Sequence, residues 1–260
     1  MKVTVLTENT TKHENLTAEH GLSLFIETEK HNILFDMGQT DAFAENAQKL
    51  GVDLKTADTA VLSHGHYDHG GGLAKFLEIN KRASVYMNEK AFGNHYNVSE
   101  KYIGIDKELQ GNGRIVLVPD MFVIDDELSL HSCNSMQRKY PSNPYGLGIE
   151  RDGRIVPDDF LHEQYLLINE NGKRYLFSGC SHKGVLNIAE WFKPDVFIGG
   201  FHLSKLDVDS AVLAETAKIL LENDTKYYTA HCTGVEQYGF MKKIMGERLE
   251  YLSTGLVQIV

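Results

Sequence analysis

The sequence has few cysteines, no long apolar run and no excess of basic residues. Only Cys133, Cys180 and Cys232 occur among its 260 residues, and such a sparse, odd set does not form the disulfide framework of a small secreted protein. No segment approaches the roughly 18 consecutive apolar residues that span a bilayer. The chain turns polar at residues 7–9 without the apolar core and cleavage site of a secretory signal. These absences predict a cytoplasmic protein that has no membrane partner.

The charge balance restricts the partners further. Lysine and arginine number 26 against 36 aspartates and glutamates, which gives a formal net charge of -10. An acidic surface disfavours general affinity for nucleic-acid backbones and anionic lipids. It does not disfavour a small anionic substrate bound to a metal ion, because a local dication outweighs diffuse surface charge. We therefore expect a small-molecule substrate and no nucleic acid; the sequence does not specify the oligomeric state.

Short strands and helices alternate along most of the chain. The middle, residues 88–160, is the least regular part, and residues 138–146 resemble a long loop of the kind that forms a lid or a substrate wall. No repeat, low-complexity tract or linker interrupts the pattern, which favours one domain over residues 1–260 with helices covering mixed sheets. Strands are expected at 2–6, 22–27, 32–35, 59–62, 114–118, 121–124, 128–131, 163–168, 174–177, 195–198, 225–229 and 256–260, and helices at 40–49, 73–78, 184–192, 207–222 and 235–245.

The strongest chemical signal is the segment His64-Gly65-His66-Tyr67-Asp68-His69, which directly follows the apolar strand expected at 59–62. Imidazoles at alternate positions of an extended loop can point to the same metal ion, and Asp68 and His69 can serve a second ion. The adjoining glycines let the loop bend tightly around an ion. Nitrogen and carboxylate ligands together suit zinc, iron or manganese. The alternative, a histidine-rich surface loop without a function, does not account for four ligand-type residues in six positions.

This segment resembles the HxHxDH signature of the metallo-β-lactamase superfamily, and Phe35-Asp36-Met37-Gly38 resembles the FDxG element that precedes it. The resemblance extends over nearly the whole chain. It implies an α/β fold of the αββα type, a sandwich of two mixed sheets with helices on the outer faces and metal ions at one edge. In that scheme Asp36 is not a ligand but lies behind the ligands and fixes the metal loop.

Four further stretches, 19–23, 179–182, 199–203 and 231–234, resemble a prokaryotic branch of the superfamily. That branch is typified by 7,8-dihydropterin-6-yl-methyl-4-(β-D-ribofuranosyl)aminobenzene 5′-phosphate synthase, an enzyme of methanopterin biosynthesis. The match is informative about lineage and less informative about substrate, since members of one fold carry out different chemistry.

The family scheme requires ligands from distant positions. His162 precedes the strand expected at 163–168, where the family's third histidine falls, and His231 matches the final histidine. Cys180 occupies the position of the bridging aspartate of most members, so it either supplies a thiolate, which suits zinc, or lies near the metals. The expected ligand set is His64, His66, Asp68, His69, His162, Cys180 and His231.

The other histidines differ in context. His182 and His202 each follow an expected strand end, so contact with substrate or metal and simple packing both remain open. His20 sits in an early loop that could line the pocket. Cys133 is read as inert, and the side chain of Cys232 should point away from the site if its segment is extended. The histidines read as structural are His13, His31, His95 and His131.

The predicted function is hydrolysis of a small, phosphorylated or pterin-like substrate. Two divalent ions, zinc in the first place with iron or manganese as alternatives, would lower the pKa of a bridging water. Asp68 would orient this water and take its proton, and His202 or His182 would assist the oxyanion or the leaving group. Arg138, Lys139 and Lys183 are the candidates to meet a phosphate, or else plain surface charges. An iron-dependent redox enzyme and a non-catalytic metal sensor are the alternative functions.

Overall fold

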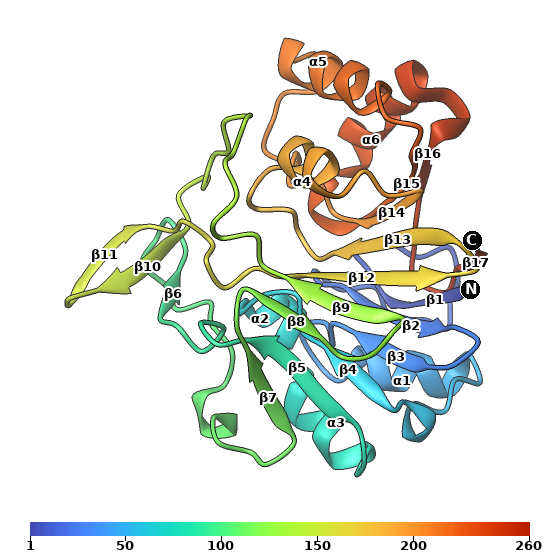
Figure 1. Cartoon of the computed structure of the whole chain (residues 1–260), viewed down its shortest axis with the longest axis vertical. Coiled ribbons are helices and arrows are strands. Elements are labelled where there is room, and N and C mark those ends of the chain that lie inside the picture. The colour runs from blue at the N-terminus through green and yellow to red at the C-terminus, as the bar shows by residue number, and fades with distance from the viewer.

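Two seven-stranded sheets form the framework of the computed structural model, which describes all residues 1–260 (Figure 1). The strands of the first sheet follow the order β17-β1-β2-β3-β4-β5-β7. Its later strands β3, β4, β5 and β7 run parallel to one another. The bounds are β1 Lys2–Thr7, β2 Ser23–Glu27, β3 Asn32–Phe35, β4 Thr59–Val61, β5 Ser84–Asn88, β7 Ile115–Val118 and β17 Val257–Ile259.

The second sheet follows the order β16-β15-β14-β13-β12-β9-β8. β12 and β13 form the hairpin expected at Asn171-Gly172, and both turn residues have positive φ, 52° and 75°, as a type I′ turn requires. From β13 to β16 the strands are parallel. The bounds are β8 Met121–Val123, β9 Leu128–His131, β12 Tyr165–Glu170, β13 Lys173–Ser178, β14 Val196–Gly199, β15 Lys226–Thr229 and β16 Leu249–Tyr251.

Helices cover the outer face of each sheet (Figure 1). Two of them, α1 (Ala42–Lys49) and α3 (Leu73–Ile79), pack on the first sheet. Three others pack on the second sheet: α4 (Val185–Phe192), α5 (Ala211–Leu220) and α6 (Val235–Met245). The layer order is helix, sheet, sheet, helix, so the expected αββα sandwich is confirmed.

Strand β1 shows why the sheets are buried on both sides. Val3 and Val5 belong to the cluster between the two sheets, whereas Leu6 belongs to the cluster under α1 and α3. Successive side chains of a strand point to opposite faces, so Val5 and Leu6 place β1 between two packed layers. Between the sheets, Phe35 and Phe177 face each other with ring centroids 5.8 Å apart.

Several elements were not expected from the sequence. Strand β5 and strand β16 complete the two sheets, and a small sheet projects from the body of the molecule in Figure 1. Its strands are β6 (His95–Tyr96), β10 (Gly148–Arg151) and β11 (Arg154–Pro157). No regular strand or helix interrupts 132–147, which agrees with the predicted long loop.

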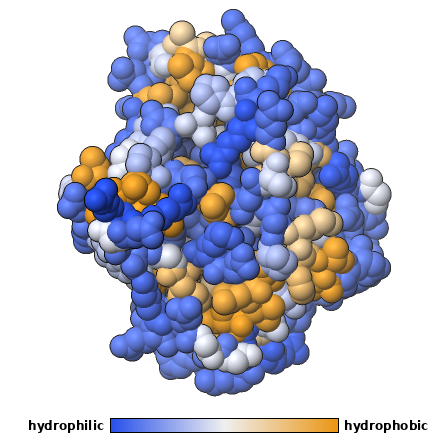
Figure 2. Space-filling view, turned by 60° about the vertical axis from the view of Figure 1, so that its left-hand side comes forward, coloured by the Kyte–Doolittle hydropathy of each residue, from blue (hydrophilic) through white to orange (hydrophobic).

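The surface is mainly polar on the face that Figure 2 presents, with separate hydrophobic patches between the polar residues. None of the helices combines the length and the apolar character needed to cross a membrane.

Candidate metal centre

The ends of parallel strands bring the predicted site residues together. Asp36 directly follows β3, and Ser63-His64 follow β4 with Leu62 between. In the second sheet, Cys180, His202 and His231 lie two or three residues after the ends of β13, β14 and β15. Because parallel strands end at the same edge of a sheet, residues from distant chain positions meet there. The two sheets thus contribute opposite walls of one site.

The HxHxDH segment has a more compact shape than the extended loop that the sequence suggested. His66 is extended, with φ -96° and ψ 147°, and caps a one-turn helix α2 (Tyr67–Gly70) that carries Asp68 and His69. A Cβ on Gly65 would lie 2.0 Å from the carbonyl oxygen of Ala91. Glycine is therefore needed between the two histidines because the neighbouring backbone passes too close for any side chain.

We expect Gly65→Ala to lower the free energy of unfolding by about 1–3 kcal/mol, the usual cost of overpacking a rigid backbone contact. Gly239→Ala is the matched control, since Gly239 lies in α6 with open space around it and alanine stabilises a helix interior by about 0.5–1 kcal/mol. Urea unfolding of both variants measures the difference. Equal stability of Gly65→Ala and the unmodified protein would show that the loop can move away at no cost.

A first group of ring nitrogens involves His64, His66 and His182. The Nε2 atoms of His64 and His182 are 3.2 Å apart, and the His66 ring centroid lies 4.6 Å from that of His64 and 5.1 Å from that of His182. His66 Nε2 and His182 Nδ1 are buried and have no hydrogen-bond partner. Burial, together with the neighbouring imidazoles, holds the pKa of all three well below the usual histidine value. At neutral pH these rings are uncharged, so their lone pairs are available to a cation.

A second group lies beside the first. His69 Nε2 is 3.2 Å from Cys180 Sγ and 3.3 Å from His231 Nε2. Asp68 Oδ2 is 3.3 Å from His231 Nε2 and 3.7 Å from His69 Nε2. Burial alone would raise the pKa of Asp68, but His69, His20 and His231 hold it well below its usual value. Nitrogen, sulfur and carboxylate oxygen therefore converge here, and Asp68 is ionised at neutral pH.

Asp36, which the family resemblance placed behind the ligands, contacts His69 of the second group. Its carboxylate accepts hydrogen bonds from the backbone N–H and the hydroxyl of Ser63, both 2.7 Å, and contacts His69 Nδ1 at 2.7 Å. Burial alone would lower the pKa of His69, but the carboxylates of Asp36 and Asp68 raise it. Asp36 holds a ring proton at Nδ1, so Nε2 is the atom that faces the centre.

The N-terminal segment supplies a second support that sequence reasoning missed. Asn9 Oδ1 lies 2.7 Å from His231 Nδ1, and Glu8 accepts the His231 backbone N–H at 2.7 Å. These contacts join residues more than 220 positions apart. No local signal in the sequence marks Glu8 or Asn9 as partners of His231.

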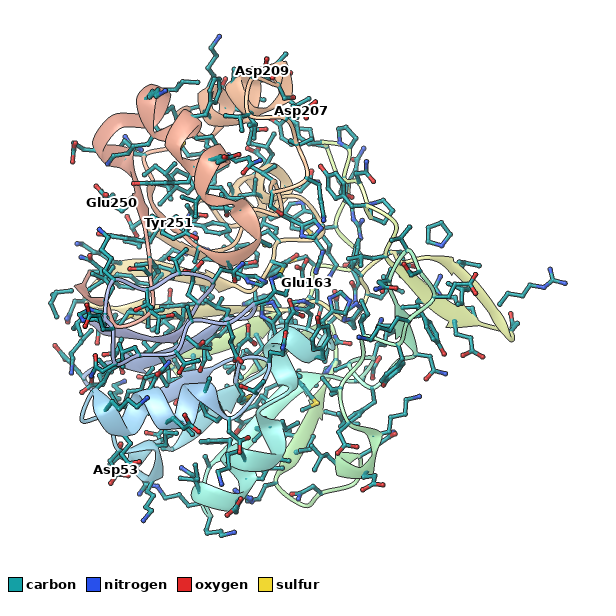
Figure 3. All side chains as sticks on the ribbon, turned by 180° about the vertical axis from the view of Figure 1, so that it is seen from behind. Asp53, Glu163, Asp207, Asp209, Glu250 and Tyr251 are labelled. Atoms are coloured by element: carbon teal, nitrogen blue, oxygen red, sulfur yellow. The ribbon has the colours of Figure 1, made fainter.

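His182 is held by a buried polar network around Glu163, which Figure 3 places in the middle of the molecule. Glu163 accepts the backbone N–H groups of His182 and Lys183 at 2.7 and 3.0 Å, and the Tyr165 hydroxyl at 2.7 Å. Lys183 is fully buried and donates to the carbonyl oxygens of Ser132 and Glu163. Burial lowers the pKa of Lys183 to about 8. The reading of Lys183 as a solvated charge or a phosphate contact is therefore wrong.

Four residues of this site have a strained backbone. Asp36, Ser181, His202 and His231 all have φ between 51° and 60°, a left-handed conformation that is costly for residues with a side chain. The strain turns each chain segment sharply at the end of its strand. Such strain persists only where the surrounding structure fixes it, which is consistent with a site under functional constraint.

His162 lies apart from the two groups just described. Its Nδ1 accepts the Gly65 backbone N–H at 2.9 Å, and its Nε2 is 3.3 Å from Asp158 Oδ2. His95 Nδ1 contacts the same carboxylate oxygen at 3.0 Å, and the rings of His95 and His162 are 3.9 Å apart. The sequence reading of His95 as merely structural did not foresee this placement beside His66 and His162, and Asp158 was missed.

Three other expectations have mixed outcomes. His20 reaches the site, with Nε2 3.3 Å from Asp68 Oδ2. Cys232 was expected to point away, but residues His231–Thr233 form a 3₁₀ turn, and its Sγ lies 3.4 Å from the Cys180 carbonyl oxygen. His202 stands beside His182, with ring centroids 4.3 Å apart. The extended-strand assumption failed at Cys232 because the chain turns immediately after β15.

The donor set fits divalent metal ions. Separations of 3.2–3.3 Å between His64 and His182, and between His69 and its neighbours, match the spacing of ligand atoms that share one ion at about 2.0–2.3 Å. The buried, unpartnered Nε2 of His66 is also accounted for by a cation, since an unsatisfied polar atom is costly to bury. His/Asp/Cys groups able to hold an ion are thus present; the donor atoms alone do not distinguish zinc from iron or manganese.

Acid should destabilise the metal-free protein through its buried histidines. Burial and the nearby His95 lower the pKa of His162 to about 4, against about 6.5 in an unfolded chain. The unfolded state therefore binds a proton first, so stability from this residue is complete above pH 6.5 and is lost as the pH falls towards 4. The loss is on the order of 3 kcal/mol for this histidine.

Urea unfolding of the chelator-treated protein between pH 7 and pH 4.5 measures this effect. We expect His162→Gln to have a flatter pH dependence than the unmodified protein. Equal slopes for the two proteins would contradict the neutral, buried state of His162.

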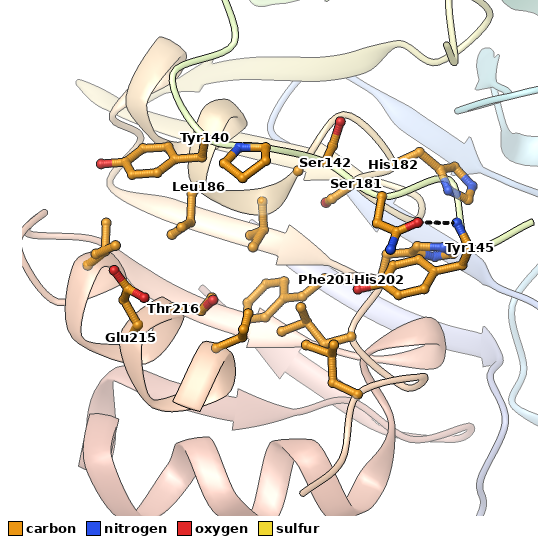
Figure 4. Close-up of a pocket in the computed structure, with 18 of the residues that line it drawn as sticks. Tyr140, Ser142, Tyr145, Ser181, His182, Leu186, Phe201, His202, Glu215 and Thr216 are labelled. Atoms are coloured by element: carbon orange, nitrogen blue, oxygen red, sulfur yellow. Dashed lines mark hydrogen bonds between the residues drawn. The ribbon is translucent and has the colours of Figure 1, made fainter. Parts of the chain in front are cut away.

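An open cavity of about 660 Å³ adjoins the centre at His182 and His202. Figure 4 shows Tyr145 beside His202 at this end, and Tyr140 and Glu215 at the far end. The predicted long loop supplies one wall of this cavity through residues 140–145. Neither Arg138, Lys139 nor Lys183 lines the cavity.

The fold and the site together define a class of αββα proteins in which histidine, aspartate and cysteine side chains able to hold metal gather at one edge of both sheets. The family model of the metallo-β-lactamase superfamily matches residues 16–144. This chain belongs to the metallo-β-lactamase superfamily.

Relatives of full length support the same assignment. A 7,8-dihydropterin-6-methyl-4-(β-D-ribofuranosyl)-aminobenzene-5′-phosphate synthase of Methanocaldococcus jannaschii is 30% identical over 92% of this chain and 90% of its own. The uncharacterized protein MJ0448 of the same organism is 28% identical over 94% of this chain and 99% of its own. The crystal structure of Tm1679, described as a metal-dependent hydrolase of the β-lactamase superfamily, has a TM-score of 0.81 and 29% identity, and the match covers 100% of this chain and 99% of that one.

Proposed function

We propose that this protein is a metal-dependent hydrolase that acts on a small, pterin-like substrate carrying a flat ring. The observation that supports the proposal most is the set of buried ring nitrogens, uncharged and facing one another, at the inner end of an open cavity. A site of this kind combines a cation-binding centre with room for an organic molecule. One relative is named as a dihydropterin-related synthase, which supports a pterin-like substrate. A structural neighbour is described as a metal-dependent hydrolase, which supports hydrolysis as the reaction.

Seven residues would hold a pair of divalent ions, zinc in the first place with iron or manganese as alternatives. Such a pair, when bound, supplies the Lewis acidity that lowers the pKa of water towards neutrality. His162, which the sequence assigned to this pair, contacts Gly65 and Asp158 instead, and His182 would take its place. The proposed ligands are His64, His66 and His182 for one ion and Asp68, His69, Cys180 and His231 for the other.

Two side chains of the chain would act on water and substrate. Asp68, kept ionised by its histidine neighbours, would accept a hydrogen bond from the attacking water and so orient it. His202 lines the cavity next to Tyr145, with ring centroids 5.4 Å apart, and would donate a proton to the developing oxyanion or leaving group. His182 would no longer be needed as a proton donor, because its Nε2 faces His64 Nε2.

The walls of the cavity support a substrate with a flat, largely uncharged ring. Tyr140, Tyr145 and Phe201 line it, and no lysine or arginine does. Aromatic side chains stack on flat rings with a gain of about 0.5–1.5 kcal/mol each. A phosphate on the substrate would therefore meet the metal centre or solvent rather than a basic side chain of this cavity.

Tyr145→Ala tests the cavity as the substrate site. A screen of phosphodiesters, phosphomonoesters, lactones and thioesters with the metal-loaded protein first identifies a substrate. On that substrate we expect KM to rise about 3- to 10-fold, the equivalent of one lost stacking contact, while metal content stays unchanged. Tyr96→Ala, at a tyrosine outside the cavity, is the control. If the fully metal-loaded protein turns over none of these compound classes, the result would favour the non-catalytic metal sensor instead.

A further inference from the structure

The cavity beside the candidate metal centre has polar side chains at both ends and a mainly apolar lining between them. His182 and His202 lie at the inner end, and Glu215 lies at the far end (Figure 4). The side chains between the two ends include Leu186 and Phe201. A ligand that fits this cavity therefore needs a largely apolar body with a polar group at each end.

Glu215 supplies the only carboxylate of the cavity lining, which contains no lysine or arginine. The residue is exposed on α5, and Figure 4 shows its carboxylate pointing from that helix towards the wall that carries Tyr140. Glu190 of α4 pairs with Lys193. Glu215 has no such ion-pair partner, although Lys218 follows it in α5. Its two oxygens are therefore free to accept hydrogen bonds from a ligand.

A carboxylate restricts the chemistry of the group that it can bind. At neutral pH it accepts hydrogen bonds and donates none, so the far end of the cavity selects a group with N–H donors. Two adjacent N–H groups in the plane of a ring match its two oxygens, which is the two-point geometry of arginine–carboxylate pairs. A fused 2-amino-4-oxopyrimidine ring has this edge, because its ring N–H and its exocyclic amino group are neighbours. Pterins and guanine compounds share this chemistry.

We propose that Glu215 is a specificity-determining residue that binds the 2-amino-4-oxopyrimidine edge of a pterin-like substrate. This inference rests on the proposed function and deepens it. With that edge at Glu215, the substituent on the other ring of the pterin points towards His182 and His202. His182 is the only proposed metal ligand in the cavity lining. The bond that reacts therefore lies in this substituent and not in the pyrimidine ring.

The test is the binding of pterin and lumazine to the zinc-loaded full chain, followed by the fluorescence of these compounds. Lumazine has a carbonyl oxygen in place of the 2-amino group, so it lacks one donor and places an acceptor against the carboxylate. We expect the unmodified protein to bind pterin about 10-fold more tightly than lumazine, the lower end of what a hydrogen bond to a charged group contributes. Glu215→Gln should bind pterin about 10-fold more weakly and lumazine no more weakly than the unmodified protein does.

Glu222→Gln is the matched control, since Glu222 is an exposed glutamate just beyond the end of α5 and does not line the cavity. It should keep the unmodified affinity for both compounds, and circular dichroism checks the fold of both variants. Guanosine separates the two sources of the recognised edge. Tighter binding of guanosine than of pterin, lost in Glu215→Gln, would overturn the pterin as the ligand.

The outcomes separate this inference from the proposed function. Equal affinities of the unmodified protein and Glu215→Gln for pterin, or no binding of pterin at all, would overturn the role of Glu215. Hydrolysis of another compound in the screen would then leave the reaction class intact. Selective pterin binding that depends on Glu215, without turnover of any compound class, would support the role of Glu215 and contradict the proposed hydrolase.

Discussion

Replacing His66 by alanine should remove metal and activity together while most of the fold is retained. Loss of a partner that merely orients a ligand weakens metal binding by about 10- to 100-fold, so loss of the ligand itself should exceed 100-fold. His66 is suited to this test because its Nε2 is buried and has no hydrogen-bond partner within the protein. Truncating it therefore breaks no hydrogen bond at that atom, and the effect reports on the cation. Elemental analysis after desalting and an activity assay are the measurements.

The control for this variant is His131→Ala, a partly buried histidine of β9 that contacts Ser129. It should keep both metal and activity. Full metal content in His66→Ala would mean that the ligand assignment is wrong. Loss of metal in both variants would point to general destabilisation instead.

Asp36→Asn should weaken metal binding by about 10- to 100-fold although Asp36 is not a proposed ligand. The carboxylate accepts from two Ser63 groups and holds the proton on His69 Nδ1. Asparagine has one acceptor oxygen, so its NH₂ group must face either Ser63 or His69. If the NH₂ group faces His69 Nδ1, that nitrogen must accept a hydrogen bond. The ring proton of His69 then moves to Nε2, the atom that should offer its lone pair to the metal ion. Facing Ser63, it leaves a buried donor unsatisfied, at a cost of about 1–3 kcal/mol.

Competition with a chelator measures the affinity, and urea unfolding of the metal-free protein measures the stability. Asp58→Asn is a close match, because Asp58 also contacts a histidine, His31 Nδ1 at 3.0 Å, and a backbone N–H, that of Asn32. That pair lies at the surface away from the centre, so we expect no change in metal affinity. Equal affinities for Asp36→Asn and Asp58→Asn would show that Asp36 does not orient His69.

The fold could be predicted from the sequence wherever the signal is local. Apolar strands such as 32–35, followed by turn residues, mark the sheet regardless of what lies across from them. The hairpin at Asn171-Gly172 is fixed by the positive φ that its turn requires. By contrast, β6 has two residues and exists because His95 pairs with Ile149 of β10. Such a strand is stabilised by a distant partner and leaves no periodicity to detect.

The same distinction between local signals and distant partners explains which site residues could be predicted. The HxHxDH loop, Asp36, Cys180 and His231 could be identified because each carries a motif or follows a strand end. His95 and Asp158 could not, since the contact between them depends on the pairing of β6 with β10 and on the turn after β11. His162 and His182 precede and follow the same hairpin, and which of them faces His64 depends on side-chain direction. Sequence position alone does not settle that direction.

The account depends on cations that bring together the nitrogens at the sheet edge. The most direct measurement is anomalous X-ray diffraction at the zinc absorption edge from crystals of the metal-loaded protein. We predict strong peaks within bonding distance of His64, His66 and His182, and of Asp68, His69, Cys180 and His231. An anomalous map without a peak near these residues, from protein shown to contain zinc in solution, would contradict the metal centre and the proposed hydrolase with it.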